Sequence, residues 1–287
     1  MIPTHNRADS LMRALRSVLA QTHKVLEVVV VADGCKDDTL KRVEAVRDQR
    51  VQIVPLRNNV GGAEARNIGI SKCTGAFISF LDDDDEWLPN KTQAQLKAFR
   101  EHRDASIVSC HHLEVNPFGA IVRSAPLEIR LTDLLYRNHC GSFSFCMVRR
   151  ESIRGLRIGK TLAACQDWDL WIKILSVHPE RARCRTVPQV LTHYHAGHHQ
   201  RLSTNISNAL TSRTSFLREH WPLMNPEQRH YQMFELTKMR RRARLERLSY
   251  VSRVRSYVKA LRHYALSEYD QRVYNYLLLI SKLVSHS

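Results

Sequence analysis

The sequence predicts an α/β fold in which a mixed, mostly parallel sheet is flanked by helices and followed by a helical extension. Two observations predict this. Over the first 200 residues, continuous apolar runs of strand length alternate with segments of helical periodicity, which is typical of α/β sheets. From about residue 205 onward the periodicity is helical only. We therefore expect an α/β domain over residues 1–205 and a basic helical region over residues 206–287.

The first strand and the first helix are predicted at the start of the chain. The opening MIPTHNR offers only Met1 and Ile2 ahead of a proline, so we expect either a start that lacks a few apolar residues or a short edge strand. Residues 11–22 place leucine, alanine and valine on one helical face, after Asp9 or Ser10 as a cap. This spacing predicts a helix.

The elements that follow are predicted in turn. The β-branched run at 25–34 predicts a strand that is buried on both faces. Pro89 stands at the first turn of a predicted helix over 89–102. Further strands are predicted at 51–56, 75–83 and 105–115, and further helices at 37–49 and 61–73.

The composition is that of a globular protein whose charge is unevenly spread. The 287 residues are 43% hydrophobic and 25% charged, with a formal net charge of +16. Residues 201–287 carry 16 Lys or Arg against 6 Asp or Glu. A segment of this kind suits nucleic acid, an anionic membrane surface or an acidic substrate. Nucleic acid is not expected as a partner, because the chain has no known nucleic-acid-reading motif and its acidic cluster at 82–86 would repel phosphate.

The cysteines and the hydropathy predict a cytoplasmic protein. The seven cysteines are widely spaced and form no C-x-x-C pair, so reduced thiols are expected and a structural zinc site is not. No stretch approaches the roughly 20 apolar residues that cross a bilayer. Charged residues interrupt any apolar core that a signal peptide would need.

Polar residues follow three predicted strands at the point where each strand ends. The segments that carry them are Pro3-Thr4-His5-Asn6, Asp33-Gly34 and the run Asp82–Asp85. Ligands of open α/β sheets bind at this edge of the sheet. Adjacent carboxylates raise one another's pKa unless a cation is present, and oxygen ligands suit a hard ion such as Mg²⁺ or Mn²⁺. The run therefore predicts one side of a metal–diphosphate site, and the alternative is a solvated acidic turn.

Five motifs follow one another along the chain: PTHNR at 3–7, VVVVADGCKDDT at 28–39, NNVGGAEARNIGI at 58–70, FLDDDDEWLPNK at 80–91 and QDWDLWIKIL at 166–175. In this order they resemble the motifs of the family 2 glycosyltransferases. The resemblance covers about residues 2–205. It implies the GT-A fold, a nucleotide-sugar donor and a transfer that inverts the anomeric centre.

The resemblance also implies roles for residues on the donor side. Pro3 and Thr4 would line the base and the ribose of the nucleotide. Asp33 would hydrogen-bond the uracil ring. It would do so without a second aspartate, because Ala32 stands where many relatives have one. Arg66 would contact the base or the diphosphate.

The acidic run resembles the D-x-D motif of the family. Asp82 and Asp84 match the motif pair and would bind the nucleotide-sugar, while Asp83 falls at the variable position. Asp84 or Asp85 would bind the divalent metal. A histidine of the segment 192–203 would complete the metal shell, with His198 as our choice and His195 and His199 as alternatives.

Asp167 matches the aspartate that serves as catalytic base in the family. The chain departs from the family pattern just before it, where Gln166 replaces the usual glutamate. We expect activity to survive, because the base itself is kept. Asp167 is also suited to cap the helix that follows, and the two roles are compatible.

The resemblance and the charge together predict the function. We expect a metal-dependent, inverting glycosyltransferase that moves a sugar from a nucleotide-sugar to a hydroxyl of a glycan or lipid-linked acceptor, in bacterial-type surface polysaccharide synthesis. UDP is the favoured nucleotide, with dTDP and GDP as alternatives. The basic helices would hold the enzyme at the anionic inner face of the plasma membrane, or else expose a solvated basic face. The alternative function is a non-catalytic relative that only binds nucleotide-sugar.

Overall fold

The computed structural model describes residues 1–180, 182–196 and 206–247 of the chain. It divides into two compact units, Met1–His230 and a second that begins at Tyr231. The two sheets and the site described below belong to the first unit. The division predicted at residue 205, between a catalytic domain and a basic region, stays a prediction about function.

The first sheet has three parallel strands in the order β1-β2-β3. The strands are β1 (Ile2–Thr4), β2 (Val28–Asp33) and β3 (Val51–Leu56), and the helices between and after them are α1 (Ala8–Leu19), α2 (Thr39–Glu44) and α3 (Gly62–Lys72). All six residues of β2 are buried, as the continuous β-branched run predicts. Val28 and Val30 join the core formed with α1, whereas Val31 lies against Gly69 of α3.

The second sheet is mixed and largely antiparallel. Its seven strands are β4 (Phe77–Ser79), β5 (Glu86–Trp87), β6 (Ala105–Asn116), β7 (Gly119–Arg123), β8 (Glu128–Ile129), β9 (Met147–Arg149) and β10 (Arg183–His195). Only β6 and β10 pair in parallel; the other pairs are antiparallel. The two-residue connection between β6 and β7 allows no other direction. The mixed α/β fold is thus confirmed, while the mostly parallel arrangement holds for the first sheet alone.

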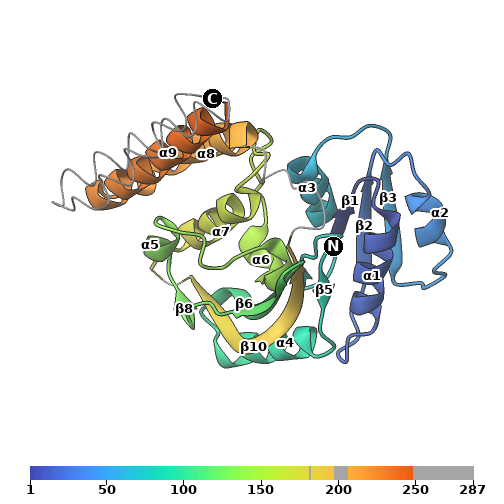
Figure 1. Ribbon diagram of the computed structural model, residues 1–287. Helices are drawn as coiled ribbons and strands as arrows, with labels where there is room; N and C mark the ends of the chain where they lie inside the picture. The colour runs from blue at the N-terminus through green and yellow to red at the C-terminus, as the bar shows by residue number, and fades with distance from the viewer. Residues whose placement is uncertain (181, 197–205, 248–287) are drawn as a thin grey trace. The chain divides into compact units, whose positions relative to one another are not determined.

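The other described helices follow α3 along the chain. The helices are α4 (Lys91–Glu101), α5 (Leu131–Leu134), α6 (Arg150–Ile153), α7 (Gln166–Val177), α8 (Ile206–His220) and α9 (Pro226–Arg247), with 3-10 turns η1 (Phe143–Phe145) and η3 (Trp221–Leu223). Figure 1 shows α4 on one side of β6 and β10 and α7 on the other. Among the described helices, none combines the length and the apolar character needed to cross a membrane.

The strand predicted at 75–83 is much shorter than expected. Regular pairing ends at Ser79, but Phe80 and Leu81 stay buried, and the Leu81 amide donates to the carbonyl of Met1 at 3.1 Å. The chain therefore runs beside β1 before it turns at the acidic residues. This places the acidic turn next to the carboxyl end of β1.

Candidate functional site

A cavity of about 250 Å³ brings together most of the site residues that the sequence predicts. Pro3, Arg66, Asp82, Asp84 and Asp167 all line it. They come from β1, α3, the acidic turn and the first turn of α7, so residues up to 164 positions apart share one cavity wall. The carboxyl-end position expected from the strand pattern is the position observed.

Asp82 and Asp83 of the acidic turn have different partners. Asp82 accepts hydrogen bonds from Arg66 Nη2 and, at 3.2 Å, from the Ser142 hydroxyl. Asp83 is buried and accepts from Thr4 Oγ1 at 2.7 Å and from Arg7 Nη1 at 3.0 Å. Burial raises the pKa of Asp83, and Arg7 opposes the shift. Although Asp83 matches a variable position of the motif, it joins the acidic turn to the end of β1 here.

Asp84 and Asp85 lie on different sides of the cavity wall. Asp84 lines the cavity and pairs with Arg7 Nη1 at 3.2 Å. Asp85 is fully buried; it accepts from Ser144 Oγ at 2.6 Å and from the amide of His195 at 3.1 Å. Burial, with Asp82 and Asp84 nearby, raises the pKa of Asp85 well above its usual range. Of the two predicted metal ligands, Asp84 is therefore the one at the cavity.

Arg66 is held from three sides. Its Nη1 donates to Gln166 Oε1 at 2.8 Å and to the carbonyl of Gly62 at 3.2 Å, while Nη2 pairs with Asp82. The guanidinium lies over the ring of Phe143, 4.4 Å from its centroid. A cation fixed in this way is preorganised to meet an anionic ligand.

Asp167 lies in the first turn of α7, where the helix dipole favours an anion. Its Oδ1 accepts from the amide of Trp168 at 2.7 Å. Burial raises the pKa of Asp167 to about 6; Asp82 adds to the shift, whereas the Trp168 hydrogen bond and Arg66 oppose it. The N-cap position is taken by Cys165, so the capping role considered for Asp167 is wrong.

Thr4 and Asp33 are nearby but do not line the cavity. Thr4 is buried and holds Asp83. Asp33 is buried as well and accepts from the amides of Val60 at 2.7 Å and Gly61 at 2.9 Å, so it shapes the loop that leads into α3. The predicted contacts of Thr4 and Asp33 with the nucleotide stay predictions.

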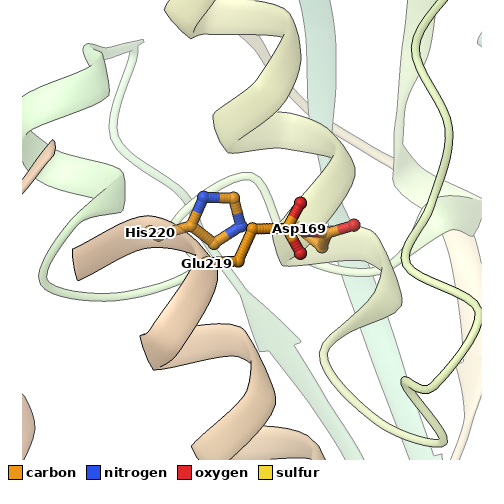
Figure 2. A group of neighbouring side chains, drawn as sticks. All are labelled: Asp169, Glu219 and His220. Atoms are coloured by element: carbon orange, nitrogen blue, oxygen red, sulfur yellow. Dashed lines mark hydrogen bonds and ion pairs between the residues drawn. The ribbon is translucent and has the colours of Figure 1, made fainter. Parts of the chain in front are cut away.

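The histidine predicted to complete a metal shell, His198, lies outside the described residues, as does His199. A different group of possible ligands is present at α7 and α8, formed by Asp169, Glu219 and His220 (Figure 2). Lys173 Nζ bonds to Asp169 at 2.9 Å and to Glu219 at 2.7 Å. Because the Lys173 ammonium pairs with both carboxylates and His220 bonds to Asp169, these side chains connect α7 and α8 through ion pairs.

Sequence reasoning missed several cavity residues. Arg7 stands inside the quoted PTHNR motif and Tyr194 inside the segment 192–203, so a motif signal was present for both. Ser142 and Phe143 had no such signal, since GSFSF shows neither a strand nor a helix pattern. Their place in the site follows from η1 folding back beneath the acidic turn, where Ser144 Oγ also accepts from the Asp82 amide at 3.0 Å.

Comparisons with known proteins concern the family and the fold of this chain. Residues 1–157 match the sequence profile described as glycosyl transferase family 2. A glucosyltransferase of Escherichia coli, named UDP-Glc:alpha-D-GlcNAc-diphosphoundecaprenol beta-1,3-glucosyltransferase WfaP, is 28% identical over 202 residues, which is 69% of this chain and 77% of that protein.

Two further similarities are more limited in what they show. An uncharacterized glycosyltransferase of Rickettsia bellii is 40% identical over 103 residues, 36% of this chain, but the match spans only 15% of that longer protein. The crystal structure of Staphylococcus aureus TarS residues 1–349 with UDP-GlcNAc superposes with a TM-score of 0.64 at 16% identity, over 91% of this chain and 79% of that one. The TarS similarity concerns the fold.

Proposed function

The chain belongs to glycosyl transferase family 2, and from this premise we propose that it transfers a sugar from a UDP-sugar to an acceptor hydroxyl with inversion. One observation supports the proposal most. Asp82 and Asp167 line the same cavity, and Arg66 lies between them, bonded to Asp82 and to the neighbour of Asp167. A donor-binding carboxylate and a base are thus held at one place, as a single displacement requires.

The donor is held by the acidic turn and the residues around it. Arg66 offers its charge to the diphosphate, Asp82 and Asp84 contact the sugar nucleotide, and Pro3 and Thr4 lie at the end of β1 beside the nucleotide. Asp33 orders the 58–61 loop, which would border the base.

Asp167 takes the proton of the attacking hydroxyl. With its pKa raised to about 6, it is a stronger base than an ordinary carboxylate and is still ionised at neutral pH. The hydroxyl becomes acidic as it bonds to the sugar, so proton transfer to Asp167 occurs late in the displacement.

The residues at the cavity fit a divalent ion. Asp82 and Asp84 offer oxygen ligands of the kind that Mg²⁺ and Mn²⁺ prefer. When bound, the ion would neutralise charge on the leaving diphosphate as a Lewis acid. Asp84 would hold it, with Asp85 fixing the turn from behind through Ser144 and His195. Arg7 pairs with Asp84 and with its neighbour Asp83.

The acceptor is a glycan or a lipid-linked sugar of surface polysaccharide synthesis. The name of the E. coli relative describes transfer to a sugar on a lipid diphosphate. Residues 238–247 of α9 carry six Lys or Arg, a charge that suits an anionic membrane surface. We place the enzyme in the cytoplasm, in peripheral contact with the inner face of the plasma membrane.

A thermal-shift screen of nucleotide-sugars with and without Mn²⁺ tests the donor side. A ligand that binds the folded state alone raises the Tm. UDP-sugars should raise it only with Mn²⁺ present, and Asp84→Ala combined with Asp85→Ala should remove the effect. Equal stabilisation in the presence of a chelator would contradict metal-dependent binding.

The non-catalytic alternative rests on Gln166, which stands where the family has glutamate. Hydrolysis of the bound donor separates the two functions. An enzyme should release UDP from the UDP-sugar slowly in the absence of acceptor, and Asp167→Asn should abolish the release. A chain that binds the donor and never releases UDP would be a binding protein.

A further inference from the structure

The loop 159–165 forms part of the cavity wall directly before the catalytic helix. Ala163, Ala164 and Cys165 line the cavity next to Asp167. The backbone of Cys165 has a φ of +62°, in the left-handed region. Residues other than glycine rarely adopt this conformation, and the surrounding structure must hold them in it. The loop therefore needs contacts from outside itself to keep this shape.

Ser212 of α8 supplies the closest of these contacts. Its hydroxyl oxygen accepts hydrogen bonds from the amides of Ala163 at 3.0 Å and Ala164 at 3.1 Å. The side chain is 1% exposed, so water does not compete for these donors. A single hydroxyl thus satisfies two successive amides of the cavity wall, 48 and 49 residues away in the sequence.

The helix that carries Ser212 is itself fixed on α7. The guanidinium of Arg213 lies over the Trp168 ring, 4.2 Å from its centroid, and Phe216 packs on the same ring at 4.6 Å between centroids. One turn further along, His220 Nε2 bonds to Asp169 Oδ1 at 2.8 Å, as Figure 2 shows. α8 therefore cannot shift without disturbing α7, which carries Asp167 in its first turn.

Two other side chains complete the hold on the loop. Gln166 Nε2 donates to the carbonyl of Leu162 at 2.7 Å, and Asp169 Oδ2 accepts from the amide of Gly159 at 3.0 Å. Both lie on α7, whereas Ser212 holds the loop from α8. The wall is thus clamped between the two helices.

We propose that α8 is part of the catalytic unit and that Ser212 is a positioning residue, which holds the 159–165 loop as the acceptor-side wall of the cavity. The inference rests on the proposed transfer reaction. The donor-binding groups come from β1, α3 and the acidic turn, whereas this loop runs straight into Asp167, the group that meets the attacking hydroxyl. Ser212 therefore acts on the reaction through the loop and leaves donor binding unchanged.

Ser212→Ala tests the inference, with Thr211→Ala as the matched control. Thr211 is exposed, and its hydroxyl bonds only within the helix, to the carbonyl of Ser207 at 3.0 Å. In Ser212→Ala, the amides of Ala163 and Ala164 should exchange hydrogen at least tenfold faster. The kcat of UDP-sugar hydrolysis should fall about tenfold, while the KM for the donor and the Kd of UDP with Mn²⁺ stay within twofold. Ser212→Thr, which keeps the hydroxyl, should restore most of the kcat.

Three outcomes would overturn the inference. A wild-type kcat in Ser212→Ala, despite faster amide exchange, would show that the loop does not position the reaction. A parallel loss of kcat, UDP affinity and Tm, without recovery in Ser212→Thr, would reduce Ser212 to a packing residue. A wild-type chain that hydrolyses no nucleotide-sugar would instead remove the proposed function, and the inference with it.

Discussion

Arg66 joins Gln166 and Asp82 through the two ends of one guanidinium, with Nη1 bonded to the amide oxygen and Nη2 to the carboxylate. The residue that departs from the family pattern is thus a direct partner of the arginine expected to meet the donor. A glutamate there would place a second negative charge on Arg66. The neutral amide leaves more of the positive charge of Arg66 for Asp82 and for the diphosphate.

Arg66→Lys should weaken donor binding although it keeps the charge. An ammonium cannot bond to Asp82 and Gln166 in the fixed geometry of the guanidinium, nor lie flat on Phe143. We expect the Kd of UDP with Mn²⁺ to rise about tenfold, since hydrogen bonds to charged groups contribute about 1.5–3 kcal/mol. Calorimetry measures this, with exposed Arg57→Lys as the control. An unchanged Kd would contradict the role of Arg66.

Gln166→Glu should destabilise the fold at neutral pH. An ionised carboxylate cannot donate to the carbonyl of Leu162, and the site is buried. We expect the free energy of unfolding to fall by about 1–3 kcal/mol at pH 8. The loss should shrink at low pH, where the introduced carboxyl becomes protonated and can donate again. Urea unfolding at both pH values measures this, and exposed Gln52→Glu should show no such loss.

Asp167→Asn should remove activity and stabilise the fold. Loss of a positioned base costs about 10²–10⁴ in rate. The folded-state pKa of about 6 lies above the unfolded value of about 3.9, so the contribution of Asp167 to stability is full below pH 4 and lost as the pH rises through 6. Asparagine carries no such loss, so the Tm of the variant should exceed that of the wild type at pH 8 and approach it at pH 4. If the Tm of Asp167→Asn at pH 8 were lower than that of the wild type, the raised pKa of Asp167 would be contradicted.

The pH dependence of the reaction rate should follow the titration of Asp167. A base must be deprotonated, and kcat/KM follows the pKa of the free enzyme, so kcat/KM should fall on the acid side with a midpoint near pH 6. Donor hydrolysis measured between pH 4.5 and 8 gives this midpoint. A rate that stays level down to pH 5 would mean that a group other than Asp167 takes the proton.

Asp84→Asn and Asp85→Asn should separate metal binding from support of the turn. Asp84 lines the cavity, so its substitution should weaken Mn²⁺ binding at least tenfold in the presence of UDP. Asp85 is buried and bonded to Ser144 and His195, so its substitution should lower the Tm and change Mn²⁺ affinity less than threefold. Electron paramagnetic resonance of Mn²⁺ measures both. If Asp85→Asn weakened Mn²⁺ binding more than Asp84→Asn did, Asp85 would be the metal ligand.

The sequence predicted where the site lies better than it predicted which atoms face the ligand. The acidic run follows a buried strand, and that alone placed it at the carboxyl edge of the sheet. The inward position of Asp83 depends on Thr4 and Arg7, which are 79 and 76 residues away. No local pattern contains such a contact. For that reason a position that is variable in the motif turned out to be a buried structural residue.

The second sheet was harder to predict for a related reason. β6 was expected from its apolar run, but β5, β8 and β9 have only two or three residues each. Strands this short do not complete two periods of alternation, so tertiary packing decides them. The same limit applies to η1, which with its N-cap residue Ser142 supplies two serine hydroxyls, those of Ser142 and Ser144, to the acidic turn.

The hold of α8 on the cavity wall has a consequence for recombining members of this family. The part of the chain that the family profile matches ends at residue 157, ahead of both the loop and Asp167. A chimera joined at that boundary would take the proposed donor-binding residues from one parent. Asp167, the 159–165 loop and Ser212 would come from the other parent. Crossovers placed after His220 instead would keep the loop, Asp167 and Ser212 from a single parent, and such hybrids should remain active.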